Sequence, residues 1–261
     1  MISPLEFSVE IAQKAGRLLA ESFSPFGTMA SLKSDQTLVT QADLDSNTLI
    51  TSAIKEHFPE DLILSEEDNT QAGDLTQPTW IIDPLDGTTN FSLGLPIWGV
   101  SIARLVNGFP QTAALYFPIL DELFCAEAGG GAFLNNAPLE PVRTSSSQGI
   151  SFFACCSRTF RQYQVSLPYK VRILGAAAYN ICSVARNTAI LCMEVSPKIW
   201  DLAGGWLLVE ESGGVIELLE TETPFPLSSQ IDYSSKSFPL LAGKDRGILN
   251  YAEKNIQKRK D

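Results

Sequence analysis

Apolar residues recur at helical spacing in the first sixty positions of the chain. Residues 3–6 combine a capping serine, a proline suited to the first helical turn and a capping-box glutamate, and apolar positions then follow every three or four residues as far as Leu19. The same spacing over residues 44–58 predicts a second amphipathic helix. We therefore expect two helices that pack against other elements at the start of the fold.

Two short apolar runs, residues 62–64 and 80–82, predict buried strands that end in acidic residues. Glu66 follows the first run, and Asp83 and Asp86 follow the second. Residues 66–68 are all acidic, and three adjacent acids in a loop usually form a solvated cluster. Ligands, however, tend to bind where neighbouring strands of an α/β sheet end. The pattern indicates that the two strand ends share a site.

The second acidic strand end has the composition of a cation site. Pro84 fixes its own φ and favours an extended conformation at Asp83, so that both aspartates and the carbonyl oxygen of Leu85 can turn toward one point. Gly87 lets the backbone approach a ligand, and a short helix that begins at Thr88 would direct free amides at an anion held by the cation. A simple Asp-Pro turn would produce the same local pattern.

Asp43 precedes the apolar positions of the second predicted helix. An acid there favours the helix dipole, and the same residue could also serve the site. The spacing leaves both interpretations open.

The middle of the chain reads as a β meander. Residues 98–106 and 111–117 are strand-like and are joined by Asn107-Gly108, a strong hairpin signal. Shorter strands flank the glycines at 129–131, and the polar, serine-rich residues 141–149 mark a boundary between two halves. We expect one domain over residues 1–261, with halves of about 1–145 and 146–261 and the site between them.

The second half alternates apolar strands and helices, and two of its acids stand out. Glu194 lies near the end of an apolar strand, where it serves a site or pairs with Arg186 or Lys198. Asp201 lies at a helix start and is followed by small residues that allow close packing. The expected elements are strands at 151–156, 171–174, 189–195, 215–219 and 239–242 and helices over 176–186, from 199 to the glycine pair at 213–214, and from about 244.

The composition of the chain excludes several kinds of partner and catalytic site. The chain has 261 residues, 44% of them hydrophobic, and a net charge of −11, which argues against nucleic acid as a partner. The five cysteines form no Cys-x-x-Cys pair, and no signal peptide or membrane span is evident, so we expect a cytoplasmic protein in a reducing compartment. His57, the single histidine, makes a histidine-based catalytic or zinc site improbable and favours an oxygen-bound cation.

Three segments together resemble the signatures of the inositol monophosphatase family of lithium-sensitive, Mg²⁺-dependent phosphatases: residues 66–67, 83–90 and 200–204. Their order and intervals match across nearly the whole chain. The resemblance implies a mixed α and β fold with alternating αβαβα layers, a homodimer, and two or three Mg²⁺ ions as cofactor, with Mn²⁺ as a possible substitute.

The resemblance also implies roles for individual residues. Thr88, with Glu66, would orient and activate the attacking water, Asp43 would support Thr88, and the amides of Gly87 and Thr88 would hold phosphate oxygens. The implied metal ligands are Glu66, Asp83, the carbonyl of Leu85, Asp86 and Asp201.

Substrate recognition is implied for Gly175, Ala176, Ala177 and Glu194, together with Asp86 and Asp201. Ala176 stands where a serine or threonine is common in the family, and residues 152–168 match no segment of it. The expected reaction is hydrolysis of a small phosphomonoester, foremost myo-inositol monophosphate, by activated water. The alternatives are fructose 1,6-bisphosphate, histidinol phosphate or 3′-phosphoadenosine 5′-phosphate as substrate, or a catalytically silent metal-binding regulator.

Overall fold

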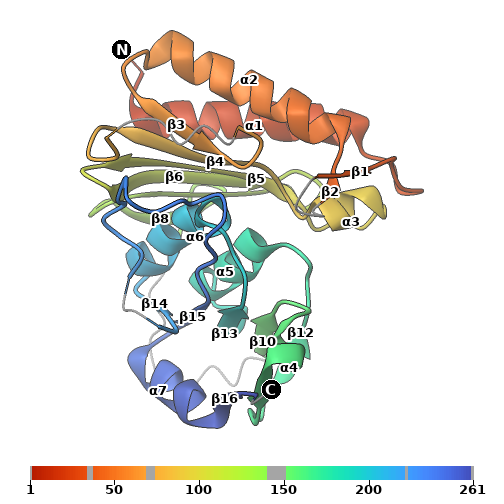
Figure 1. The fold of residues 1–261 in the computed structure, drawn as a ribbon, viewed down its shortest axis with the longest axis vertical. Coiled ribbons are helices and arrows are strands. Elements are labelled where there is room, and N and C mark those ends of the chain that lie inside the picture. The colour runs from red at the N-terminus through yellow and green to blue at the C-terminus, as the bar shows by residue number, and fades with distance from the viewer. Residues whose placement is uncertain (1, 34–37, 69–73, 140–150, 221–222, 260–261) are drawn as a thin grey trace.

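The chain folds into alternating layers of helices and sheets, as the computed structural model shows (Figure 1). The structure describes residues 2–33, 38–68, 74–139, 151–220 and 223–259. Helices α1 (Pro4–Ser22) and α2 (Gln41–His57) cover the outer face of the first sheet, and α5 (Ala177–Ala185) and α6 (Ile199–Glu211) lie between the first sheet and the second. Helix α7 (Arg246–Asn255) packs beyond the second sheet. This arrangement confirms the expected αβαβα fold.

The first sheet has seven strands in sequence order, so neighbouring strands are mostly joined by hairpins. Only the first two strands run parallel, which brings the ends of both to the same edge of the sheet. The strands are β3 (Leu62–Ser65), β4 (Thr79–Asp86), β5 (Gly99–Val106), β6 (Phe109–Phe117), β7 (Glu122–Glu127), β8 (Gly131–Leu134) and β9 (Ala137–Pro138).

The second sheet has five strands in the order β12-β10-β13-β15-β14. β10 runs parallel to both of its neighbours, whereas β15 is antiparallel to β13 and β14. The strands are β10 (Phe152–Cys155), β12 (Lys170–Arg172), β13 (Ala189–Glu194), β14 (Val215–Leu218) and β15 (Leu240–Gly243). The remaining elements are β1 (Ser31–Leu32), β2 (Leu38–Val39), β11 (Tyr163–Val165), β16 (Ile256–Lys258), α3 (Thr88–Ser92) and α4 (Thr159–Gln162).

The sequence pattern predicted the bounds of most helices and strands to within a few residues. Helix α1 begins with the expected capping box, in which Ser3 and Glu6 each accept from the other's amide. Helix α2 begins at Gln41, three residues before the expected start, because Thr40 and Asp43 form a second capping box that fixes the first turn.

Two elements differ from the expectation: β4 is longer, and an additional strand follows the last helix. Strand β4 does not end at residue 82 but continues to Asp86, with a register irregularity between Asp83 and Asp86 against β5. The expected helix from about residue 244 ends at Asn255, and Ile256–Lys258 forms a strand that pairs antiparallel with Tyr163–Val165. The expected boundary at 141–149 lies outside the described residues, so the division into halves stays a prediction.

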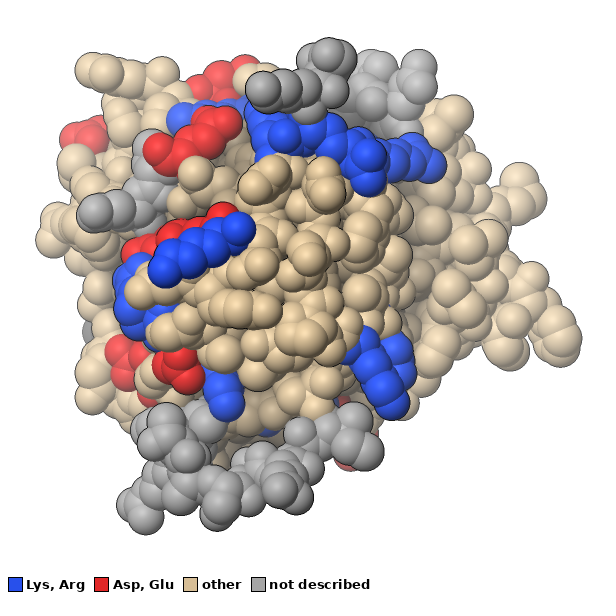
Figure 2. Space-filling model, turned by 90° about the horizontal axis from the view of Figure 1, so that it is seen from below, with Lys and Arg blue, Asp and Glu red and all other residues tan. Residues whose placement is uncertain are grey.

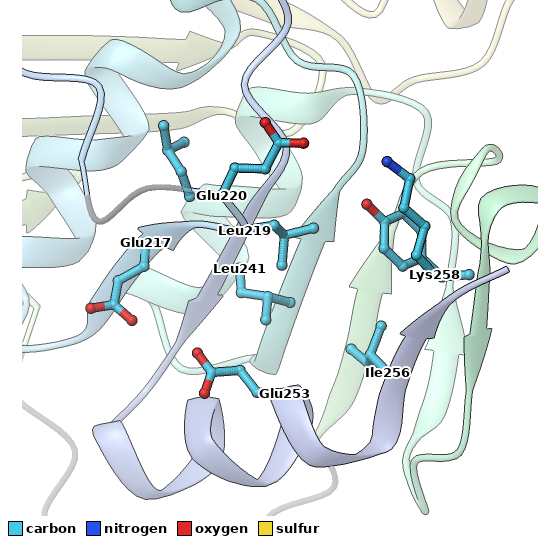
Figure 3. Close-up of a pocket in the computed structure, with 9 residues that line it drawn as sticks. Glu217, Leu219, Glu220, Leu241, Glu253, Ile256 and Lys258 are labelled. Atoms are coloured by element: carbon cyan, nitrogen blue, oxygen red, sulfur yellow. The ribbon is translucent and has the colours of Figure 1, made fainter. Parts of the chain in front are cut away.

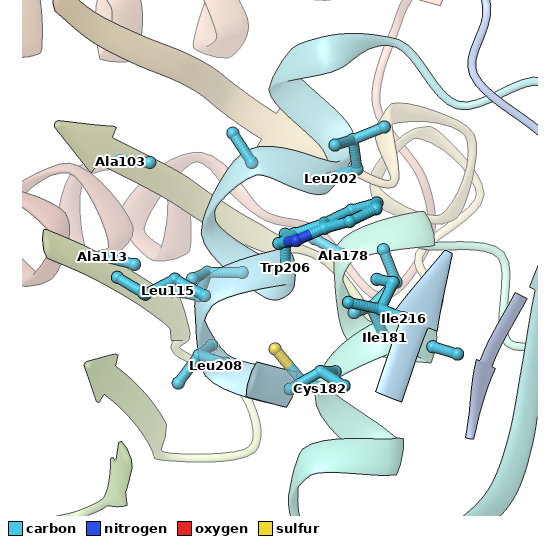
Figure 4. Packing of buried hydrophobic residues seen from close by; sticks show 14 of the residues in the cluster. Ala103, Ala113, Leu115, Ala178, Ile181, Cys182, Leu202, Trp206, Leu208 and Ile216 are labelled. Carbon is cyan, nitrogen blue, oxygen red and sulfur yellow. The ribbon is translucent and has the colours of Figure 1, made fainter. Parts of the chain in front are cut away.

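Helix α6 packs closely against the first sheet and α5, as its small residues predicted. Figure 4 shows its side chains between those of β5 and β6 on one side and those of α5 on the other. A Cβ atom on Gly204 would lie 2.7 Å from Leu115 Cδ1, and one on Gly205 would lie 2.7 Å from Ile181 Cγ2. This packing fixes the N-terminus of α6, and with it Asp201, relative to the first sheet. Among the described residues, no helix is both long and apolar enough to span a membrane.

The close packing of α6 can be tested by adding volume at Gly204. Gly204→Val is expected to lower the free energy of unfolding by about 1–3 kcal/mol, because the new methyl groups would overlap the Leu115 side chain and Ser101 Oγ. Urea denaturation measures this change. Gly247→Val, at an exposed position of α7, serves as the control, and equal stability of the two variants would contradict the packing argument.

Candidate active site

A cavity of about 890 Å³ collects the acidic ends of several elements. Strand β4, helix α3 and the N-termini of α5 and α6 each contribute residues to its wall. Of the residues expected from the sequence, Asp43 alone is not part of the lining. The others are all there: Glu66, Asp83, Leu85, Asp86, Gly87, Thr88, Gly175, Ala176, Ala177, Glu194 and Asp201.

Three aspartates converge in this cavity. One carboxylate oxygen from each of Asp83, Asp86 and Asp201 lies within 4.8 Å of the others. Asp83 and Asp86 come from the end of β4, and Asp201 comes from the first turn of α6, 115 positions further along the chain than Asp86. Glu66 joins them from the end of β3, where its amide donates to the Ile82 carbonyl.

Backbone amides hold each aspartate in place. Asp83 Oδ1 accepts from the Leu85 amide at 3.0 Å, and Asp201 Oδ2 accepts from the Lys198 amide at 2.7 Å. Asp86 accepts from three amides in the first turn of α5, at 2.9, 3.0 and 3.4 Å. The free amides of two helix starts therefore orient carboxylates that would otherwise repel one another.

The carboxyl groups resist ionisation because they are buried together. Burial, and then the negative charge of neighbouring carboxylates, raises the pKa of Asp201 to about 7 and the pKa of Asp83 well above its ordinary value. Burial also raises the pKa of Asp86 to about 7 against the opposing amides of α5. For Glu66, burial raises the pKa to about 7 although the nearby Lys33 lowers it.

Thr88 is held by a chain of hydrogen bonds that reaches back to helix α2. Its hydroxyl oxygen lies 3.1 Å from Asp43 Oδ1 and 3.0 Å from the Leu85 carbonyl oxygen. The other oxygen of Asp43 accepts from the amide and hydroxyl of Thr40. Asp43 therefore caps α2 and also accepts from the Thr88 hydroxyl, and its role in the site stays a prediction.

The loop before α5 forms part of the cavity wall beside Asp86. Asn90 donates from Nδ2 to the carbonyls of Ile97 and Leu174, at 2.6 and 2.8 Å. Gly175 has φ +83°, and a Cβ atom there would lie 2.5 Å from Asn90 Oδ1. A glycine is therefore required at the turn that brings Ala176 and Ala177 to the cavity.

Glu194 pairs with an amide and not with either of the bases considered for it. Asn180 Nδ2 donates to Glu194 Oε1 at 2.6 Å, whereas Arg186 binds Glu122 and the Lys198 ammonium donates to main-chain carbonyls. Burial raises the pKa of Glu194 to about 8. The Asn180 Oδ1 atom is buried without a hydrogen-bond partner among the described residues, so this end of the cavity has an unused acceptor.

Sequence reasoning missed several residues at the site. Asn180 and Lys33 carry no recognisable motif, and Lys33 precedes a polar loop far from the acids in sequence. Segment 152–168, which matched no family pattern, delivers Cys156, Ser157 and Arg158 to the cavity wall. A cysteine followed by hydroxyl and basic residues at the end of an apolar strand was the available signal.

A second pocket of about 340 Å³ lies between β14, β15, α7 and β16 (Figure 3). Glu217, Glu220 and Glu253 line it together with apolar side chains, and Glu217 is bound by Arg246. Among the residues that the structure describes, its acids do not converge as those of the first cavity do. On the face seen in Figure 2, Lys and Arg side chains border a broad uncharged area. The larger cavity is therefore the site of interest.

The donor set of that cavity fits a hard divalent cation. Its converging side chains supply carboxylate oxygens, and the single histidine, His57, lies exposed at the end of α2. Oxygen-only ligation suits Mg²⁺, Mn²⁺ or Ca²⁺ better than zinc. The raised pKa values are what a group of carboxylates shows when no cation balances its charge.

Comparison with known proteins identifies the relatives of this chain. The family model described as "Inositol monophosphatase family" matches residues 3–255. The chain is 37% identical to "Inositol monophosphatase 3" of Solanum lycopersicum over 81% of its own length and 84% of the relative's. It is 33% identical to "Nus factor SuhB" of Vibrio cholerae over 88% and 91% of the two lengths. The solved IMPase of Thermotoga maritima superposes with a TM-score of 0.78 and 26% identity over 96% of this chain and 94% of that one.

The buried carboxylates predict how the stability of the metal-free protein depends on pH. The pKa of Glu66, Asp86 and Asp201 is about 7 in the folded chain against ordinary values of 4.5 for Glu and 3.8 for Asp, so the unfolded chain releases these protons first as pH rises. Between about pH 4 and pH 7 these groups therefore lower the free energy of unfolding progressively. MgCl₂ should raise the melting temperature clearly at about pH 8 and much less at about pH 5.

Differential scanning calorimetry in EDTA and in MgCl₂ measures this effect, with KCl at equal ionic strength as the control. A stabilisation by Mg²⁺ of the same size at both pH values would contradict a carboxylate site.

Proposed function

The chain belongs to the inositol monophosphatase family of phosphatases, and on that premise we propose that it hydrolyses a small polyol phosphomonoester, foremost myo-inositol monophosphate, with Mg²⁺ as cofactor. The observation that carries the proposal is the convergence of Asp83, Asp86 and Asp201 within 4.8 Å, beside a threonine hydroxyl that a buried aspartate holds in place.

The proposed metal ligands come from one edge of the first sheet, where β3 and β4 end, and from the start of α6. They are Glu66, Asp83, the Leu85 carbonyl, Asp86 and Asp201. Bound there, Mg²⁺ would neutralise charge on the phosphoryl group and lower the pKa of a water molecule. Mn²⁺ is a reasonable substitute because it prefers the same oxygen ligands.

Other residues of the site would position the attacking water and the phosphate group. Thr88, fixed by Asp43 and the Leu85 carbonyl, orients the attacking water together with Glu66. The amides of Gly87 and Thr88 face the phosphate oxygens, and φ +90° at Gly87 gives the close backbone approach that this requires. In this arrangement the protein forms no covalent intermediate with the phosphate.

The alcohol that leaves would lie against the loop at 175–177 and Glu194. Ala176 and Ala177 offer little bulk, while Glu194 and the free acceptor on Asn180 suit the hydroxyl groups of a polyol. These features favour inositol monophosphate over the alternative phosphates. The homodimer and the cytoplasmic location stay predictions of the sequence.

A silent metal-binding regulator is the second candidate, and the name Nus factor borne by the Vibrio cholerae relative makes it worth testing. A regulator of this kind has no need for a hydroxyl held as Thr88 is held. Retention of the Thr88, Asp43 and Glu66 group therefore favours hydrolysis.

Removal of one carboxylate should abolish turnover without unfolding the chain. We expect Asp83→Asn and Asp201→Asn each to lower kcat by roughly a thousandfold or more, because the cation supplies several kcal/mol of transition-state stabilisation. Phosphate release with Mg²⁺ measures the loss, and circular dichroism checks the fold. Asp74→Asn, at an exposed position, is the control. Near-normal activity in both site variants would reject the metal centre.

A panel of phosphates tests the substrate. We expect inositol monophosphate to be turned over with a higher kcat/KM than fructose 1,6-bisphosphate, histidinol phosphate or 3′-phosphoadenosine 5′-phosphate. Glu194→Gln should raise KM for inositol monophosphate roughly tenfold by replacing a carboxyl group with an amide, and should leave p-nitrophenyl phosphate, which has no hydroxyl groups, nearly unchanged. Faster turnover of another compound in the panel would replace inositol monophosphate as the substrate.

A further inference from the structure

Lys33 extends into the acidic cavity from the chain segment that follows β1. Its ammonium lies 3.1 Å from Glu66 Oε1 and 2.5 Å from Glu67 Oε1. The lysine side chain is 20% exposed, and that of Glu67 is 5% exposed. The pair of contacts is therefore largely shielded from water, where charge-assisted hydrogen bonds are strong.

Lys33 has a special place among the charged residues around the site. Within the described parts of the chain, its ion pair is the only one that reaches any of the four clustered acids, Glu66 and the three aspartates. It arrives from β1 and β2, which lie beside α3 at the edge of the first sheet (Figure 1). Lys33 thus brings a positive charge to the site from the segment after β1, which supplies none of the proposed metal ligands.

The two acceptors of Lys33 differ in what they do for the site. Glu66 is a proposed metal ligand, and an oxygen that accepts from an ammonium is not free to bind a cation at the same time. Glu67 faces Lys33 at the shorter distance, so the ammonium keeps a charged partner when it gives up Glu66. Exchange of Lys33 for a cation at Glu66 therefore leaves no buried charge unpaired.

We propose that Lys33 is a built-in counter-ion that competes with the divalent cation for Glu66 and so sets the metal affinity of the site. This inference rests on the metal site of the proposed function. In the metal-free protein Lys33 balances part of the carboxylate charge. On metal binding it shifts wholly to Glu67, and the work of that exchange weakens the observed affinity.

Metal affinity measured without turnover tests the proposal. The protein is stripped with EDTA and titrated with MgCl₂ and MnCl₂ by isothermal calorimetry at about pH 8.5, above the pKa of about 7 of Glu66. Lys33→Met removes the charge and the donors while keeping a side chain of similar length. We expect its dissociation constant for the metal to fall roughly tenfold, in line with loss of one charge-assisted hydrogen bond.

Two further variants separate competition from a general change in charge. Lys33→Arg keeps the positive charge and should bind metal within about threefold of the wild type. Lys14→Met removes a lysine that pairs with Glu10 on the exposed side of α1, and should leave the affinity unchanged. Circular dichroism in EDTA checks that each variant is folded.

A wild-type measurement covers the case in which Lys33→Met does not fold. The side-chain NMR signal of Lys33 in protein labelled at lysine should move during a Mg²⁺ titration with the midpoint found by calorimetry, while that of Lys14 stays in place. An unchanged or weakened affinity in folded Lys33→Met, or a Lys33 signal that does not respond, would overturn the counter-ion role and leave the metal site intact. Absence of metal binding in the wild type would overturn both.

Discussion

Carboxylates buried side by side repel one another, and the architecture of this protein is arranged around that repulsion. Asp83, Asp86 and Asp201 approach within 4.8 Å, and Asp83 and Asp86 are buried. Backbone dipoles offset part of this repulsion, because amides at the starts of α5 and α6 and the amide of Leu85 donate to the carboxylate oxygens. The pKa values remain raised in spite of these amides, so the remaining charge is left for a ligand to balance.

The layered fold explains how distant segments meet at this point. Strands β3 and β4 run parallel and release their acids at one edge, while α5 and α6 form a single layer shared by both sheets. Close packing through Gly204 and Gly205 sets the depth of α6 against the first sheet and against α5. An error of one residue in that packing would rotate Asp201 by about 100° around the helix axis and away from β4.

The sequence predicted those parts of the site that depend on local chemistry. The acids at the ends of two apolar runs, the Asp-Pro turn and the glycine before Thr88 are each encoded within a few residues, and the structure places them together. Asn180 and Lys33 were not predicted, because their place in the site depends on contacts with residues 14 and 33 positions away in the sequence. No local pattern indicates such contacts. The β16 strand was missed for the same reason, since its polar residues are ordered by pairing with β11 and not by their own propensity.

The side-chain amide of Asn90 donates to the carbonyls of Ile97 and Leu174, and so links the segment after α3 to the loop before α5. The two loops share one donor, so the main chain at the proposed alcohol site has little freedom to move relative to the main chain at the proposed phosphate site. In such a scaffold, recognition of a new alcohol depends on exchange of side chains, and Ala176 is a buried residue of the second loop whose side chain such an exchange would replace. The backbone acts as a fixed frame in which substrate range can diverge while the reaction stays the same.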